Sequence, residues 1–146
     1  MTRKIKPTIL IDSREKLSWE FPGFTVKRTC LQTYGCDYTI RGYGKYIGVE
    51  RKSIPDLVTC LRKPDFGERQ VARIASKEYG CIIVEGDPRN ADCMKKKIMG
   101  SDEVMIACID LMIQYNVTFL FAGDRKLAAL ACCEYLLMAK KSLDSR

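Results

Sequence analysis

Two carboxylates and one lysine form the arrangement in this sequence that best predicts chemistry. The stretch GVERKSIPD places Glu50 two residues before Lys52, and Asp37 precedes both at the start of another apolar run. Gly44 and its neighbour Tyr43 form a turn signal between the two runs. A two-residue turn at this point would set Asp37 directly opposite Glu50 on neighbouring antiparallel strands.

The same register sorts apolar from polar side chains on both strands. It places Tyr38 opposite Val49 and Ile40 opposite Ile47 on one face. A slip of one residue would mix the two kinds of side chain, so this register is the one we predict.

The predicted pair has a chemical consequence. Carboxylates directly opposed across two strands have Cβ atoms roughly 5 Å apart and repel each other unless something neutralises them. Mg²⁺ would do so, because it prefers carboxylate oxygens and water. Lys52 shares the face of Glu50 and Arg51 takes the other. Two acids and a lysine on one face suit metal-dependent phosphodiester hydrolysis. On spacing alone, a surface salt bridge between Lys52 and an acid is the commoner explanation.

Three further acids lie near expected strand or helix ends. Asp12 and Glu15 follow a buried strand, and such strand ends often present functional groups; a solvated loop is the alternative. Ser53 and Asp56 have the spacing of a capping box. Asp56 therefore either caps the following helix, which the spacing favours, or supports Lys52 or a metal-bound water.

The apolar periodicities predict an α/β fold with a mixed central sheet and helices on both faces. Early strands are expected to form hairpins, and later strands to alternate with helices. Residues 1–146 are interpreted as a single domain. The expected strands lie at 7–12, 24–31, 37–43, 45–52, 79–87 and 117–123, and the expected helices at 53–62, 66–79, 92–98, 101–115 and 124–141.

Composition favours a nucleic-acid partner and a reducing compartment. The net charge is +7, from 25 Lys and Arg against 18 Asp and Glu, which suits a polyanion but equally suits simple solubility. Eight cysteines occur without a Cys-x-x-Cys pair and mostly inside apolar patterns, so reduced thiols in the cytosol or nucleus are expected. No apolar run is long enough for a membrane span or a signal peptide.

The motifs together extend these inferences to a family. ILIDSRE, then Asp37-Tyr38, then GVERKSIPDL with Glu-Arg-Lys-x-x-x-Asp, then CIIVEG occur in this order. This order resembles the nuclease domain of the XPF-type structure-specific endonucleases, a branch of the restriction-endonuclease-like fold, over roughly residues 8–135. The resemblance implies a Mg²⁺- or Mn²⁺-dependent endonuclease acting on branched DNA. A catalytically inactive DNA-binding partner subunit is the alternative, and a basic interaction module with a chance motif is a third.

Site residues carry over from the resemblance by position. Metal binding is expected of Asp37 and Glu50, with Asp12 bordering the metal. The resemblance also implies catalytic or supporting roles for Lys52, Arg51 (whose carbonyl could reach the metal), Asp56 and Glu15. The matched residues expected to contact DNA are Arg14 and Gln70. The same contact is expected of four residues because they are basic and lie near the motif in sequence: Arg41, Lys45, Arg62 and Lys63.

The sequence also departs from the family pattern. Cys36 stands where a glycine is usual, with Gly35 one step earlier, and Cys60 stands where a serine is common. A helix-hairpin-helix domain after the nuclease domain is not expected, so a second subunit or a partner protein is expected to add DNA binding. The resemblance implies a homodimer through the C-terminal helix, and so compact a version suits a virus or phage.

Overall fold

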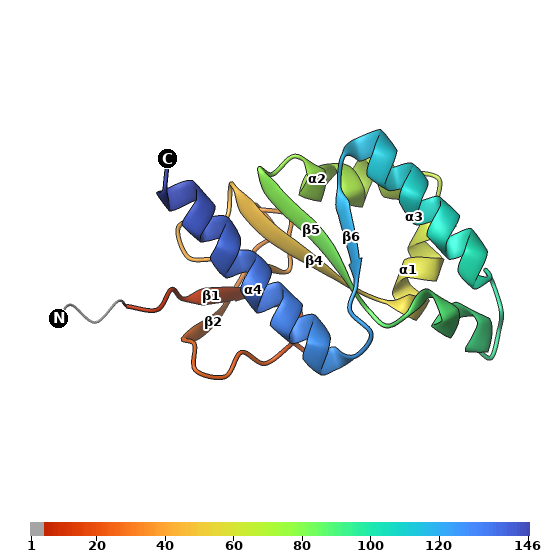
Figure 1. Ribbon diagram of the computed structural model, residues 1–146, viewed down its shortest axis with the longest axis horizontal. Coiled ribbons are helices and arrows are strands. Elements are labelled where there is room, and N and C mark those ends of the chain that lie inside the picture. The colour runs from red at the N-terminus through yellow and green to blue at the C-terminus, as the bar shows by residue number, and fades with distance from the viewer. Residues whose placement is uncertain (1–4) are drawn as a thin grey trace.

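The computed structural model describes residues 5–146 as a six-stranded sheet with helices on both faces (Figure 1). The spatial strand order is β2-β1-β3-β4-β5-β6. The strands are β1 Ile9–Asp12, β2 Val26–Thr29, β3 Tyr38–Ile40, β4 Ile47–Ser53, β5 Tyr79–Glu85 and β6 Thr118–Phe121. The helices are α1 Ile54–Leu61, η1 Gly67–Val71, α2 Ala72–Ala75, η2 Pro88–Cys93, α3 Ser101–Tyr115 and α4 Arg125–Asp144.

The sheet is mixed, as predicted, but its first two strands do not form a hairpin. β1 and β2 pair in parallel across a long connection. β3 runs antiparallel to both of its neighbours, and β4, β5 and β6 are mutually parallel. The carboxyl ends of β1, β4 and β5 therefore meet the start of β3 at one edge of the sheet. This edge is where a parallel-type sheet usually presents functional side chains.

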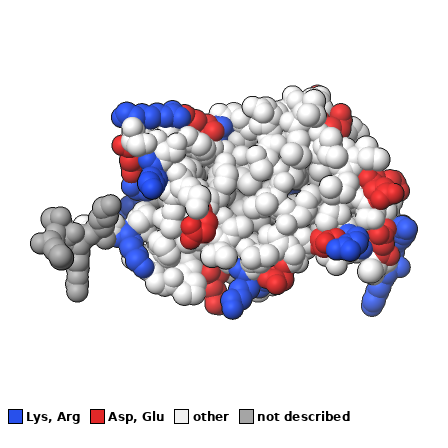
Figure 2. All heavy atoms as spheres, in the orientation of Figure 1, with Lys and Arg blue, Asp and Glu red and all other residues white. Residues whose placement is uncertain are grey.

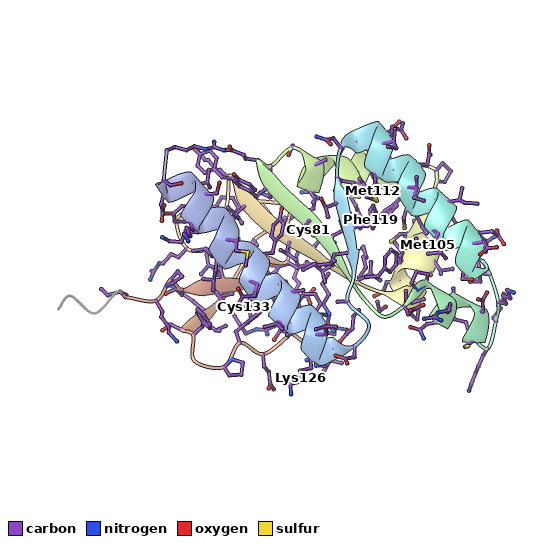
Figure 3. The ribbon with its side chains drawn as sticks, viewed as in Figure 1. Cys81, Met105, Met112, Phe119, Lys126 and Cys133 are labelled. Atoms are coloured by element: carbon purple, nitrogen blue, oxygen red, sulfur yellow. The ribbon has the colours of Figure 1, made fainter. Side chains whose placement is uncertain are left out.

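Alternation along the strands divides the core into two layers. One layer joins Leu10, Ile82 and Val84 of the sheet to the helices α1 to α3. The other joins the opposite face of the sheet to α4, which passes in front of the end of β1 in Figure 1. Cys81 of β5, labelled in Figure 3, belongs to this second layer. All eight cysteines are free thiols.

Local signals correctly placed most helices. Ser53 Oγ accepts a hydrogen bond from the Asp56 N–H at 3.2 Å and caps α1. Helix α3 begins and ends as predicted, at Ser101 and Tyr115. The expected helix over 92–98 is wrong: a short 3-10 helix, η2, precedes it and ends at Cys93, because Asp87 caps that earlier turn. Among the described residues, no helix has the length and apolarity required to cross a membrane.

Candidate active site

Asp37 lies between β1 and β4, where backbone hydrogen bonds fix it. Its N–H donates to the Val49 carbonyl at 3.0 Å, and its own carbonyl accepts from the Asp12 N–H at 2.8 Å. Its side-chain Oδ2 accepts from the Arg51 N–H at 2.9 Å. The predicted register is confirmed, since Tyr38 pairs with Val49. The predicted two-residue turn is wrong, because β3 ends at Ile40 and β4 begins only at Ile47.

Asp37 and Glu50 form a partly buried acidic pair. Burial, together with the neighbouring Glu50 carboxylate, raises the pKa of Asp37 to about 8. Burial also raises the pKa of Glu50, while Lys52 opposes this shift. Ionising both carboxyl groups in this place is therefore costly without a further cation. Their oxygens are the donors that a hard divalent cation prefers, so the pair fits Mg²⁺ or Mn²⁺.

Lys52 is held beside this pair by two acceptors. Its Nζ lies 3.5 Å from Glu50 Oε1 and 2.7 Å from Gln70 Oε1. The Phe66 ring, 5.9 Å away, borders the same amine. Gln70 thus contacts the lysine that was predicted to be catalytic, a role more specific than the DNA contact expected of it.

Gln70 is presented by an unusual helical turn. η1 is a π-helix, in which the Ala72 N–H donates to the Gly67 carbonyl five residues earlier. Such turns widen a helix locally and occur often at functional sites. The sequence predicted one regular helix over 66–79, so the widened turn was missed.

A cavity of about 240 Å³ opens beside the acidic pair. Its polar lining includes Asp37, Glu50 and Gln70, together with the guanidinium groups of Arg14 and Arg73. Two acids facing two arginines suit a bound cation together with an anionic group such as phosphate. Arg73 was missed by the sequence analysis, and its position only 21 residues after Lys52 on an ordinary helical pattern gave no signal.

Asp12 and Arg14 form a pair at the margin of this cavity. Asp12 is 2% exposed; its Oδ1 accepts from the Leu31 N–H at 3.1 Å, and its Oδ2 accepts from Arg14 Nε at 2.8 Å. Within residues 5–146, no group of three or more Asp, Glu, Cys or His side chains comes together as a metal site. The structure therefore does not bring Asp12 to Asp37 and Glu50 as a third ligand.

Arg51 lies on the opposite face of β4, as predicted, within a compensated cluster. Its guanidinium lies 2.9 Å from Glu85 Oε2 and 3.5 Å from Glu15 Oε2, and it stacks 5.0 Å from the centre of the Trp19 ring. Burial raises the pKa of Glu15, with Asp37 contributing and Arg51 opposing. The Arg51 side chain thus connects the β1–β2 loop to the end of β5.

The remaining predicted residues do not line the cavity. Asp56 is exposed in the first turn of α1, and its backbone N–H serves the helix cap. Arg62 and Lys63 lie just beyond the end of α1, away from the acidic pair. Arg41 and Lys45 lie in the β3–β4 turn at the far edge of the sheet; Lys45 is five residues before Glu50, roughly 16 Å along an extended strand.

The family pattern places a glycine directly before the aspartate, but in this chain the glycine lies one position earlier, at Gly35. The backbone conformation at Gly35 favours glycine, because its φ of +64° is left-handed. Cys36 is buried, and burial raises the pKa of its thiol to about 12. Gly48 on β4 leaves room for it, since a Cβ there would lie 2.9 Å from Cys36 Cβ. At the second departure, Cys60 Sγ accepts a long contact of 4.0 Å from Gln70 Nε2.

The sheet and the acidic pair with its lysine define an XPF-type nuclease domain. The chain belongs to the ERCC4 domain family, whose model matches residues 11–133. XPF from Aeropyrum pernix has a similar structure, with a TM-score of 0.71 and 25% identity over 95% of this chain and 68% of that one. A second structure of that protein, a complex with DNA, gives a TM-score of 0.70 and 26% identity over 94% of this chain and 66% of that one. No curated protein sequence matches this chain.

Proposed function

We propose that this protein is a metal-dependent DNA endonuclease that hydrolyses phosphodiester bonds in branched DNA. The observation that carries the proposal is the partly buried acidic pair of Asp37 and Glu50, which lines a cavity together with two arginines and has Lys52 beside Glu50. Membership of the ERCC4 domain family and similarity to an XPF structure solved with DNA support the same function.

The residues divide the work of hydrolysis. Asp37 and Glu50 would hold Mg²⁺ or Mn²⁺, which supplies a polarised water and a charge that binds the phosphate oxygens. Lys52 Nζ, fixed by Gln70, stands where it can donate a hydrogen bond to the phosphate or to the attacking water. The water oxygen bonds to phosphorus as the bond from phosphorus to the leaving sugar oxygen breaks. The start of β3 and the end of β4 hold the side chains of Asp37, Glu50 and Lys52 in place during the reaction.

The direct test is cleavage of labelled flap, fork, four-way junction, single-stranded and duplex DNA with Mg²⁺, Mn²⁺ or EDTA. Asp37→Ala and Glu50→Ala would be compared with Glu20→Gln, an exposed acid of the β1–β2 loop. Metal-dependent cutting that both alanine variants lose and Glu20→Gln keeps is the expected result. DNA binding without cutting would instead indicate an inactive partner subunit, and neither binding nor cutting would end both proposals.

We also propose that the protein forms a homodimer. Its interface would lie on a face that includes α4, the C-terminal helix for which the resemblance implied this role. Figure 2 shows that charged side chains are sparse over the centre of this face, and Met105 and Met112 of α3 lie on it in Figure 3. Ile113 of α3 is 83% exposed and lies among other exposed apolar side chains. A group of this kind is typical of an interaction surface, whereas single exposed apolar residues are common. The exposed apolar residues of α3, β6 and α4 are Met105, Ile106, Ile109, Met112, Ile113, Leu120, Leu127, Leu130 and Met138.

Sedimentation equilibrium tests this homodimer. Ile109→Glu and Leu130→Glu should each yield monomers, because an unpaired carboxylate buried in an apolar interface opposes association. Lys27→Glu, exposed on β2 at the opposite side of the sheet from β6, should leave the dimer intact. A monomeric wild-type protein would contradict the proposal.

A further inference from the structure

Arg73 borders the cavity but takes no part in the hydrolysis described above. It projects from α2, and its best protein contact is a long hydrogen bond from Nη2 to the Gln32 carbonyl at 3.4 Å. Within residues 5–146, no carboxylate lies within 4.0 Å of its guanidinium. The side chain is exposed, so its remaining donors are open to a ligand.

The other arginines nearby are already paired. Arg14 holds Asp12 through Nε and Nη2, each 2.8 Å from Oδ2. Arg69, one turn before Arg73, forms an ion pair with Asp65 at 3.0 Å. Of these three arginines, Arg73 is therefore the one that has no carboxylate partner among residues 5–146. Its positive charge lies at the cavity that the acidic pair also lines.

Gly35 allows the Arg73 side chain to lie close to the backbone beside the cavity. A Cβ on Gly35 would lie 3.0 Å from Arg73 Nε and 3.4 Å from its Cζ, so the arginine stem lies closely over this glycine. Gly35 is two residues before Asp37, and its left-handed turn therefore sets the guanidinium beside the acid. The missing side chain at Gly35 is what permits this approach.

The size of the cavity limits what Arg73 can meet. A volume of 240 Å³ equals that of roughly eight liquid waters at about 30 Å³ each. It admits a phosphodiester group with a few waters but not a base pair. Arginine binds such a group through two parallel hydrogen bonds, which lysine cannot do.

We infer that Arg73 is a substrate-binding residue that binds the DNA phosphate next to the scissile phosphate. This contact would set the register of the DNA strand in the site. The inference rests on the proposed nuclease function. Because the acids and Lys52 serve the reacting phosphate, the neighbouring phosphate is the one left for Arg73. Its contact is present before and during hydrolysis, so it contributes to KM more than to kcat.

Arg73→Ala, compared with Arg69→Ala as the matched control, tests this contact. DNA affinity would be measured in Ca²⁺ over a range of salt concentrations, and cleavage kinetics in Mg²⁺. Arg73→Ala should weaken binding about tenfold and lower the salt slope by about one ion, while Arg69→Ala changes either by little. KM should rise with kcat within about twofold, and Arg73→Lys should recover the salt slope but only part of the affinity.

Substrates with one neutral methylphosphonate linkage identify the phosphate. In the wild-type protein, one linkage beside the cut should weaken binding about tenfold; in Arg73→Ala the same linkage should have no further effect. Thermal unfolding checks that the variants are folded.

Two outcomes would overturn the inference: a wild-type salt slope and KM in Arg73→Ala, or methylphosphonate effects that are the same in both proteins at every position. A wild-type protein that binds but never cuts would contradict the proposed function alone, because the affinity measurements do not require cleavage. An effect of Arg69→Ala as large as that of Arg73→Ala would also count against a specific contact.

Discussion

The two faces of β4 carry charged clusters of opposite character. Toward α1 and α2, Glu50 joins Asp37 in a pair whose pKa values are raised by burial and, for Asp37, also by the neighbouring carboxylate. Toward α4, Arg51 meets Glu85, Glu15 and an aromatic ring, so its charge is well compensated. The adjacent residues Glu50 and Arg51 thus have different roles. Glu50 belongs to a pair whose ionisation is costly until a cation binds, whereas Arg51 stabilises the fold.

The largest effect is expected from Asp37→Asn. The amide oxygen can still accept the Arg51 N–H, but the metal loses a charged ligand, so cleavage should fall by at least about 10³-fold. Stability at pH 7.5 without metal should rise, because the amide needs no bound proton in order to be partly buried; the rise should be about 3 °C in Tm for each kcal/mol gained. Activity assays and calorimetry measure the two effects. A less stable variant would contradict the contrast between the faces.

Arg51→Met should reverse this pattern. Removing the guanidinium leaves Glu85 and Glu15 uncompensated in a partly buried place, at a cost of about 3 kcal/mol in unfolding free energy. Urea unfolding measures it. Arg69→Met, which breaks an exposed ion pair of 3.0 Å with Asp65, should cost about 1 kcal/mol or less. Equal losses would show that Arg51 has no special structural role.

The metal-free protein should lose stability as pH rises between about 4 and 8. The pKa of Asp37 is raised from 3.8 to about 8, so within this range the folded state binds a proton that the unfolded state releases. The unfolding free energy should then fall with pH, by at most about 1.4 kcal/mol per unit from this group. Saturating Mg²⁺ should weaken the trend. Chemical unfolding at several pH values tests it, with Asp37→Asn as the control; a trend that persists in that variant would assign it elsewhere.

The smallest effect is expected at Gln70, which acts on the site through Lys52. Gln70→Ala removes the 2.7 Å acceptor but leaves the Glu50 contact, so cleavage should fall about tenfold with less than about 1 kcal/mol change in stability. Gln70→Glu keeps an acceptor and should retain more activity. Gln114→Ala, exposed on α3, serves as the control. Unchanged kinetics in Gln70→Ala would remove Gln70 from the site.

Sequence patterns predicted the features that depend on neighbouring residues along the chain. Alternation predicted the pairing of Tyr38 with Val49, and apolar periodicity predicted the bounds of α3. Patterns failed where distant segments decide. The chain turns between β3 and β4 over six residues, which leaves Lys45 at the far edge although it is close to Glu50 in sequence. Arg73 joins the site only because α2 packs over Gly35, a contact that no local pattern encodes.

The π-turn of η1 makes the site depend on the number of residues as well as on their types. Its hydrogen bond from Ala72 back to Gly67 encloses one residue more than an α-helical turn does. Deleting a single residue here would restore an ordinary helix and rotate the remainder of that helix by about 100°, one residue of a 3.6-residue turn. Gln70 and Arg73 would then no longer face the acids together. Substitution scans preserve chain length and cannot reveal this dependence, whereas a one-residue deletion would.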